Sequence, residues 1–306
     1  MDSLSTSVVE CHVDLLSPSS ATLFEQFLNE RRYLKNVTPD TIDWYETAFK
    51  AFRRTLSNDA PPITKSSLQS FVVKMRQRDV KPVSVNTYIK ALNAFCRWLH
   101  EEGHLAERLE LPLLKLEKRV VQTLTDEQMT ALLARKPKGF VACRLHALVA
   151  FVLDTGVRIE EALTARVNNV DYDNLLVTVF GKGRKERRIP FSFELRKVMF
   201  RFQRERSAQC PRCELLFPSR AGTSWDQRNA LRGLHLLQEK LGLPTFGWHR
   251  LRHTFATNYL RQGGDIVRLS MVLGHSQITT TQRYLHLLTE DLSASHQKVS
   301  ILNRLG

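Results

Sequence analysis

Apolar side chains recur with a helical period from residue 21 to about residue 100. Residues 1–20 lack a clear period and are expected to form a flexible arm. From residue 21 the apolar positions fall three and four apart, which places them on one face of a helix. The third and fourth stretches carry the pattern at Leu68, Phe71, Val72 and Met75 and at Ile89, Leu92, Cys96 and Leu99. The pattern predicts four short helices in a first domain over residues 21–105.

The helical period lapses after residue 105 and returns beyond residue 120. Residues 106–120 are rich in charge and contain Pro112, which is typical of an exposed connector between domains. Thr125 and Gln128 then match a capping box, in which each side chain satisfies a backbone N–H at the start of a helix. We therefore expect a linker at residues 106–120 and a second domain over residues 121–288.

The second domain combines helical patterns with one short β-rich region. Residues 175–181 and 186–191 favour strands, and the lysine- and glycine-containing turn between them is typical of a hairpin. Gly156 and Gly274 each follow an apolar helical stretch, a position at which glycine commonly ends a helix. The predicted fold is mainly α with a small antiparallel β-sheet.

The charge balance predicts a polyanionic partner. The chain has 45 Lys and Arg against 31 Asp and Glu, a net charge of +14, and residues 51–100 alone hold 9 basic and 2 acidic groups. Nucleic acid is the leading partner class, and an anionic membrane surface is the second. The side chains expected to contact duplex DNA are Lys74, Arg76, Lys81, Lys90 and Arg97 on two helices and Arg184, Lys185, Arg187 and Arg188 at the hairpin. A solvated helix face and a merely soluble turn are the alternative interpretations.

Cysteine usage and hydropathy indicate the cellular compartment of the protein. Five scattered cysteines, an odd number, do not form a disulfide framework. No uncharged run approaches the roughly 18 residues that a membrane span needs. Cys210 and Cys213 supply half of a zinc site, but the sequence has no second CxxC pair. We expect a soluble, cytoplasmic, nucleoid-associated protein that makes no membrane contact and holds no metal.

Several basic residues stand where they could bind a phosphate. Arg158 opens a helix directly after strongly apolar residues, and its alternative is an ion pair with Glu161 three residues on. His249 and Arg252 share one face of a helical N-terminal turn, where the helix dipole favours an anion. Lys182 lies between two glycines, so its long side chain has the backbone freedom to reach inward.

Other polar residues near these positions have ordinary interpretations. Arg250 and His253 are interpreted as satisfied surface groups, which is the usual role of lone arginines and histidines. Tyr284 follows His275 by nine residues, and a lone tyrosine is most often an amphipathic packing residue. These residues indicate a functional site only when they are considered together.

Taken in chain order, six residues match a known signature: Arg158, Lys182, His249, Arg252, His275 and Tyr284. The segments TGVRIEEAL, GKGRKERRIP, HRLRHTFATNYL and LGHSQITTTQRYLHL resemble conserved boxes of the tyrosine recombinases, the phage-integrase and Xer family. The resemblance covers about residues 121–292. The N-terminal helices look like that family's SAM-like core-binding domain, whereas the 20-residue arm and the Cys210–Cys213 pair depart from its pattern.

The resemblance implies a chemistry that these residues can perform. Tyr284 is expected to attack a DNA phosphate, leaving a 3′-phosphotyrosyl link and a free 5′-hydroxyl. Arg158 and Arg252 suit the non-bridging oxygens because guanidinium forks bind phosphate in a bidentate way. His249 and His275 would bond the phosphate or handle the tyrosine proton, and Lys182 would protonate the leaving oxygen. No cofactor, ATP or metal ion is expected, so cleavage should proceed in EDTA.

The same resemblance implies a site-specific recombinase that cuts and rejoins duplex DNA and exchanges strands between two sites, in integration, excision or resolution. Exchange of four strands requires a tetramer in the synapse, with a monomer or dimer otherwise. Residues 289–306 are expected to contact a neighbouring protomer, with packing in cis as the alternative, and an accessory DNA-bending protein is left open. The rival functions are a monomeric type IB topoisomerase-like relaxase, a DNA-binding regulator without chemistry and a metal-dependent nuclease.

Overall fold

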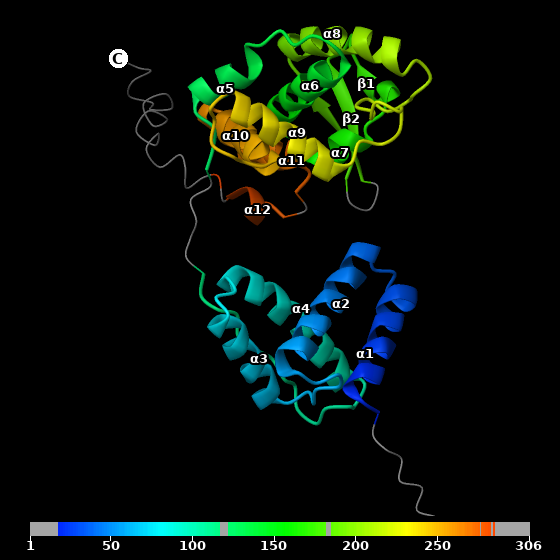
Figure 1. Ribbon diagram of the computed structural model, residues 1–306, viewed down its shortest axis with the longest axis vertical. Helices are drawn as coiled ribbons and strands as arrows, with labels where there is room; N and C mark the ends of the chain where they lie inside the picture. Colours follow the sequence, from blue (N-terminus) through cyan, green and yellow to red (C-terminus); the bar gives the residue numbers. More distant parts are fainter. Residues whose placement is uncertain (1–17, 117–121, 182–184, 276, 283, 285–306) are drawn as a thin grey trace, which may run out of the picture. The chain divides into compact units, whose positions relative to one another are not determined.

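The computed structural model describes residues 18–116, 122–181, 185–275, 277–282 and 284. The chain divides near residue 118 into two compact units, each of which is described by itself (Figure 1). The first unit contains helices and no strand among its described residues, and the second combines helices with a three-stranded antiparallel sheet. The predicted fold class is therefore confirmed.

The N-terminal unit is a bundle of helices around an aromatic core. Its elements are α1 (Ser20–Asn29), the π-helical turn η1 (Glu30–Leu34), α2 (Pro39–Leu56), α3 (Lys65–Gln77) and α4 (Pro82–Glu101). Phe24 stacks on Phe49 with ring centroids 4.0 Å apart, and Phe95 meets Phe24 edge-on at 5.1 Å. Phe52 and Phe71 are likewise fully buried and pack edge-on. These rings join the helices by offset and edge contacts, the arrangements that aromatic pairs prefer.

Residues 106–116, part of the expected connector, keep most of their side chains exposed but are docked on their own unit at Leu111 and Leu114. Asn86 and Leu114 exchange two hydrogen bonds, of 2.8 and 2.9 Å, and Asn93 and Leu111 exchange two more of 2.9 Å. Leu111 is 7% exposed against the aromatic core. Asn86 and Asn93 lie two helical turns apart, a rise of about 10.5 Å. Leu111 and Leu114 lie three extended residues apart, about 10 Å, so each asparagine can face one leucine backbone. We call these four residues the asparagine clasp.

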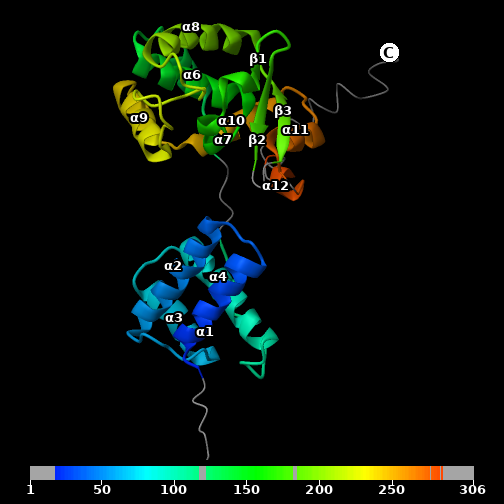
Figure 2. The ribbon, with the colours of Figure 1, turned by 90° about the vertical axis from the view of Figure 1, so that its right-hand side faces the viewer.

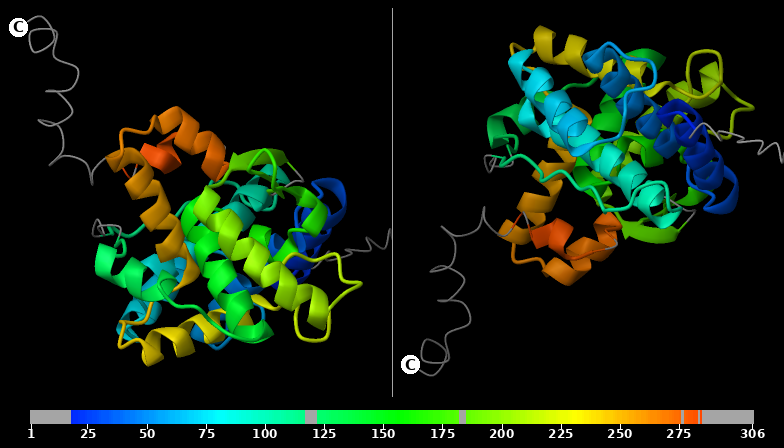
Figure 3. Two further views of the ribbon diagram at one scale, coloured as in Figure 1. Left: turned by 90° about the horizontal axis from the view of Figure 1, so that it is seen from above. Right: turned by 90° about the horizontal axis from the view of Figure 1, so that it is seen from below.

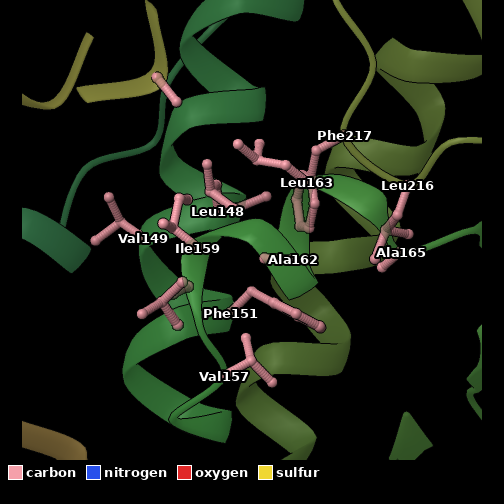
Figure 4. Packing of buried hydrophobic residues seen from close by; sticks show 14 of the residues in the cluster. Leu148, Val149, Phe151, Val157, Ile159, Ala162, Leu163, Ala165, Leu216 and Phe217 are labelled. Atoms are coloured by element: carbon pink, nitrogen blue, oxygen red, sulfur yellow. The ribbon is translucent and has the colours of Figure 1, made fainter. Parts of the chain in front are cut away.

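The C-terminal unit is built around one buried helix. Its elements are α5 (Asp126–Leu133), α6 (Phe140–Thr155), α7 (Ile159–Thr164), the short 3₁₀ turn η2 (Val167–Asn169), β1 (Val170–Asp171), β2 (Leu176–Phe180), β3 (Glu186–Pro190), α8 (Phe193–Gln209), α9 (Gln227–Lys240), α10 (Trp248–Arg261), α11 (Ile266–Leu273) and α12 (Thr279–Gln282). The capping box expected at Thr125 and Gln128 opens α5. Helix α6 is buried on nearly all sides, as a helix apolar all round should be. Figure 4 shows its Leu148, Val149 and Phe151 packed with residues of α7 and of the segment at Phe217.

Two further features of this unit position the candidate site. Helix α10 packs along α6, and α11 and α12 gather beyond one end of α10 (Figure 3). The predicted hairpin is present as β2 and β3, in a sheet ordered β1-β2-β3 (Figure 2). Its register pairs Leu176 with Pro190 and Phe180 with Glu186, and the Gly181 N–H donates to the Lys185 carbonyl at 2.9 Å. The hairpin tip, residues 182–184, lies outside the described residues.

Candidate active site

Arg158 stands at the start of α7, directly after the turn that ends α6. Gly156 ends α6 with φ +64°, and a Cβ there would lie 2.2 Å from the Phe255 ring, so glycine is required. The Arg158 backbone N–H donates to Oε2 of Glu161 at 2.8 Å, and its Nη1 donates to Oε1 at 3.1 Å. The Arg158 side chain remains 37% exposed. The ion pair considered as an alternative is therefore present, and Arg158 stays accessible to a ligand.

Arg252 is buried one turn into α10, directly beside Arg158. Its Nη1 donates to the Gly156 carbonyl at 2.7 Å, and its Nη2 donates to the Leu273 carbonyl at 2.8 Å. Nη1 of Arg158 donates to the same Leu273 carbonyl at 3.3 Å. Burial, together with the neighbouring Arg158 charge, lowers the pKa of Arg252 to about 10, which leaves it cationic at neutral pH. Two guanidinium groups that meet at one carbonyl oxygen are close enough together to bind one phosphate group.

His275 follows α11 and is oriented from both sides of its ring. Nη2 of Arg252 lies 3.0 Å from Nε2 of His275, and the Thr281 hydroxyl lies 2.8 Å from Nδ1. A guanidinium can only donate, so Nε2 accepts from Arg252 and Nδ1 carries a proton that it donates to Thr281. Thr281 is fully buried. In this arrangement the ring proton that the Thr281 contact uses lies on Nδ1.

Tyr284 is buried among apolar side chains, and its hydroxyl contacts His253, which the sequence pattern favoured as an ordinary surface group. The tyrosine is 1% exposed and packs with Ala256, Leu260, Leu269 and Leu273. Its Oη lies 2.7 Å from Nδ1 of His253. The surface interpretation of His253 is therefore wrong. The i, i+3, i+4 spacing of His249, Arg252 and His253 on one helix face was the signal that could have found it.

His249 and Lys182 complete the set of six candidates. His249 is exposed on the first turn of α10, and its ring centroid lies 6.4 Å from that of His253. Lys182 lies outside the described residues, although the neighbouring Gly181 closes the base of the hairpin. Five of the six candidates thus come from α7, α10 and the segments that follow α11 and α12, all within the C-terminal unit.

Arg187 was expected to contact DNA, but its side chain turns into the protein. Its Nη1 and Nη2 donate to the two carboxylate oxygens of Glu161 at 2.9 and 2.6 Å, and Nε donates to the Val272 carbonyl at 2.8 Å. Side chains alternate along β3, so Arg187 shares the inner face with the buried Ile189, which was a signal in the sequence. Burial raises the pKa of Glu161, but hydrogen bonds from Arg187 and Arg158 outweigh it and the pKa lies below its ordinary value.

The other basic candidates lie on the surface of their units. In the N-terminal unit the exposed side chains are Lys74 and Arg76 on α3, Lys81 before α4, and Lys90 and Arg97 on α4. In the C-terminal unit Lys185 and Arg188 are exposed on the hairpin, whereas Arg184 lies outside the described residues. Arg76 also donates to the Val80 carbonyl at 2.5 Å. These positions are open to a polyanion, and Arg187 is not.

The Cys210–Cys213 pair makes contacts with the backbone. Cys213 Sγ donates to the Gly222 carbonyl at 3.0 Å, and Cys210 Sγ lies 3.6 Å from the Ser219 carbonyl. Within the part of the chain that the structure describes, no three His, Cys, Asp or Glu side chains are placed to hold a metal ion. Among those same residues, no helix has the length and apolar character needed to span a bilayer.

Sequence relatives cover nearly all of the chain. The model of the Phage integrase family matches residues 122–291, and that of the Phage integrase, N-terminal SAM-like domain matches residues 24–103. Tyrosine recombinase XerC of Xanthomonas campestris pv. campestris (strain B100) is 29% identical over 272 residues, which are 86% of this chain and 83% of the relative. Tyrosine recombinase XerD of Vibrio cholerae serotype O1 is 27% identical over 296 residues, covering 93% of this chain and 98% of the relative.

Two solved structures that share this fold are complexes with DNA. The Tn1549 transposon integrase in complex with transposon right end DNA has a TM-score of 0.75 at 19% identity, over 92% of this chain and 99% of that one. The XerH site-specific recombinase bound to its palindromic difH substrate has a TM-score of 0.70 at 21% identity, over 92% and 85%. The family models cover both units, and the five signature residues that the structure describes lie in the second. The chain therefore belongs to the phage integrase family, the tyrosine recombinases, whose members are DNA-cleaving and DNA-rejoining enzymes.

Proposed function

We propose that this chain exchanges strands between two specific DNA sites, with Tyr284 as the nucleophile that forms a 3′-phosphotyrosyl link. The observation that carries the proposal is the meeting of the Arg158 and Arg252 guanidinium groups at the Leu273 carbonyl, beside His275. Such fixed cations stabilise the negative charge that accumulates on a phosphate under attack, each contributing about 3 kcal/mol. The tyrosine hydroxyl on the same unit supplies the attacking oxygen.

The remaining groups have roles that their positions support. His275, with its proton on Nδ1, keeps Nε2 directed at Arg252 and the phosphate site. His249, exposed at the N-terminal turn of α10, is placed to bond a phosphate oxygen where the helix dipole favours an anion. The proposal gives Lys182 the protonation of the leaving 5′-oxygen, on the strength of the family resemblance. The bond energy kept in the phosphotyrosyl link lets the strand be rejoined without ATP.

Tyr284 must change its surroundings before it attacks. Its side chain is 1% exposed and its hydroxyl contacts Nδ1 of His253, so the proposal requires this hydroxyl to become accessible to the DNA phosphate. We infer that His253 holds the unreactive position of Tyr284. Duplex binding is therefore expected to be faster than formation of the covalent adduct.

Duplex DNA is the proposed partner of both units. The exposed basic side chains of α3, α4 and the hairpin support this, as do the DNA complexes of the Tn1549 integrase and XerH. The proposal includes a tetramer in the synapse, contacts between protomers through residues 289–306, an accessory DNA-bending protein where the site requires one, and action on nucleoid DNA in the cytoplasm. Residues 289–306 lie outside the described residues.

The test is covalent capture of DNA. Wild-type protein and Tyr284→Phe are incubated in EDTA with duplex fragments flanking the gene, and SDS-resistant, protease-sensitive adducts are mapped to the strand position. We expect an adduct with wild type alone, at one position, attached through a 3′-phosphate. Duplex binding without an adduct would favour the regulator, and an adduct that needs only one DNA site would favour the monomeric relaxase.

Metal-dependent chemistry is tested by the same reaction. If the adduct or the nick appears only when Mg²⁺ or Zn²⁺ replaces EDTA, the nucleophilic role of Tyr284 without a metal is wrong. Recombination itself is read from a substrate with two mapped sites in direct repeat, whose exchange releases a circle. Loss of the circle with retention of the adduct in a chain truncated after residue 288 would support protomer contacts through residues 289–306.

A further inference from the structure

Arg187 lies at the junction of three elements that adjoin candidate active-site residues. It belongs to β3, its carboxylate partner Glu161 belongs to α7, and its carbonyl partner Val272 belongs to α11. Figure 2 shows β3 beside α11, in agreement with their packing. Its side chain is only 12% exposed, and three of its nitrogen atoms donate to protein oxygens at 2.9 Å or less. Because these nitrogen atoms already donate to protein oxygens, Arg187 is poorly placed to bind a DNA phosphate.

Glu161 is shared between Arg187 and the candidate catalytic Arg158. Each carboxylate oxygen accepts from both arginines: Oε1 from the Nη1 atoms of Arg187 and Arg158, and Oε2 from Nη2 of Arg187 and the backbone N–H of Arg158. The bidentate contact with Arg187 fixes the plane of the carboxylate. The orientation of Arg158 therefore depends on Arg187 through one intervening side chain.

Of two glycines next to candidate catalytic residues, Gly274 leaves room for the same guanidinium and Gly181 lies against it. A Cβ on Gly274, directly before His275, would lie 2.9 Å from Cζ of Arg187. A Cβ on Gly181, directly before Lys182, would lie 3.5 Å from Nη1 of Arg187 and 3.6 Å from Oε1 of Glu161. Arg187 thus packs against the backbone that precedes two of the six signature residues and hydrogen-bonds the carboxylate that holds a third.

We propose that Arg187 is a positioning residue for the cleavage reaction, which sets Arg158 through Glu161 and holds the end of α11, and with it His275, against the base of the hairpin. The proposal rests on the proposed function and deepens it. Lysine cannot replace Arg187, because one ammonium group cannot bond both carboxylate oxygens and the Val272 carbonyl in this planar arrangement.

The experiment compares Arg187→Met and Arg187→Lys with Arg158→Lys in the full chain, at saturating duplex carrying the mapped cleavage site. A second duplex has a methylphosphonate at the cleaved position, which removes the charge that an arginine would stabilise. We expect both Arg187 variants to form the adduct about 10²-fold more slowly on phosphate. Much of that loss should be recovered on the methylphosphonate, as for Arg158→Lys, with duplex affinity little changed.

The matched control is Arg166→Met, which removes an exposed Arg–Glu pair with Glu214 in the same unit. It should leave the adduct rate and its substrate preference as in wild type. The proposal is overturned if Arg187→Met weakens duplex binding and forms adduct normally at saturation, as a DNA contact would. It is also overturned if the rate falls equally on phosphate and methylphosphonate, as general destabilisation would cause.

A structural readout separates this inference from the proposed function. Hydrogen exchange of the free protein should show faster exchange in residues 157–164 and 270–275 of Arg187→Met, with α6 protected as in wild type. Unchanged exchange in both segments would overturn the positioning role even if no adduct were ever found. Absence of an adduct in wild type, with the expected change in exchange, would instead count against the proposed function alone.

Discussion

The two units of this chain differ in what they bury. The N-terminal unit buries stacked phenylalanines, and its buried polar side chains among the described residues are Thr55 and Asn86. The C-terminal unit buries Glu161 and Arg252 as well as an apolar core. Burying a charge is costly unless it is paired or hydrogen-bonded. Glu161 is paired with Arg187 and Arg158, and Arg252 donates to two backbone carbonyls. The difference teaches that one unit can act on a charged ligand only with its surface, whereas the other holds charges fixed inside.

The largest effect is expected from the aromatic core of the first unit. Phe95→Ala removes a ring that contacts Phe24, Phe27 and Phe49, so it should destabilise that unit by about 3–5 kcal/mol. Hydrogen exchange should lose protection in α2 and α4 and keep it in α6. Phe180→Ala, which removes a ring that is 48% exposed, is the control and should change stability by less than about 0.5 kcal/mol. Equal loss of protection in both units would mean that the cores are coupled.

A comparable effect on chemistry is expected from the buried cation of the second unit. Arg252→Lys cannot reproduce the contacts with Gly156, Leu273 and His275, so adduct formation should slow by about 10²–10³-fold, or roughly 3–4 kcal/mol. Single-turnover kinetics at saturating duplex measures this. Arg261→Lys, exposed at the end of the same helix, should react as wild type does. A normal rate for Arg252→Lys would remove Arg252 from the phosphate site.

The stability of the two units should differ in its sensitivity to acid. The pKa of Glu161 is lowered from 4.5, so its stabilising contribution is complete above that pH and is lost as the pH falls through the lower folded value. No Asp or Glu is buried among the described residues of the N-terminal unit. Urea unfolding, followed in single-tryptophan variants that keep Trp98 or Trp248, should lose stability below pH 4.5 mainly at Trp248. Glu161→Gln should reduce this acid sensitivity, and parallel loss at both tryptophans would contradict the prediction.

The smallest effect is expected at the surface. Lys90→Ala or Lys185→Ala removes one exposed cation, so duplex affinity should fall modestly. The slope of log binding constant against log salt should decrease by about 0.9 for each phosphate that the variant no longer neutralises. Lys50→Ala, on an exposed position of α2 outside the predicted DNA-binding set, is the control and should leave the slope unchanged. Salt titrations of duplex binding measure all three variants, and equal slopes throughout would remove Lys90 and Lys185 from the interface.

The sequence predicted those features that depend on neighbours along the chain. Helical periods located the helices of the first unit, the capping box located α5, and Gly156 and Gly274 marked the ends of α6 and α11, where φ is positive. The six signature residues were found because each lies in a short segment with a recognisable pattern. Local rules were sufficient wherever the partner lies within a few positions.

The features that the sequence did not predict depend on distant partners. His253 meets Tyr284 from 31 positions away, and Arg187 meets Val272 from 85. A basic run at a hairpin favours a solvent-exposed interpretation, which held for Lys185 and failed for Arg187, because the inner face of β3 met a carboxylate from α7. No local pattern encodes such a carboxylate.

The asparagine clasp has a consequence for avidity. A flexible tether between two binding modules sets the effective concentration at which the second meets a ligand already held by the first, and each added residue dilutes it. By fixing Leu111 and Leu114 on α4, Asn86 and Asn93 remove much of the sequence between the units from that tether. The two amide side chains thereby shorten the tether. Their loss is expected to lower the cooperation of the two units on one duplex while every side chain proposed to meet a phosphate stays in place.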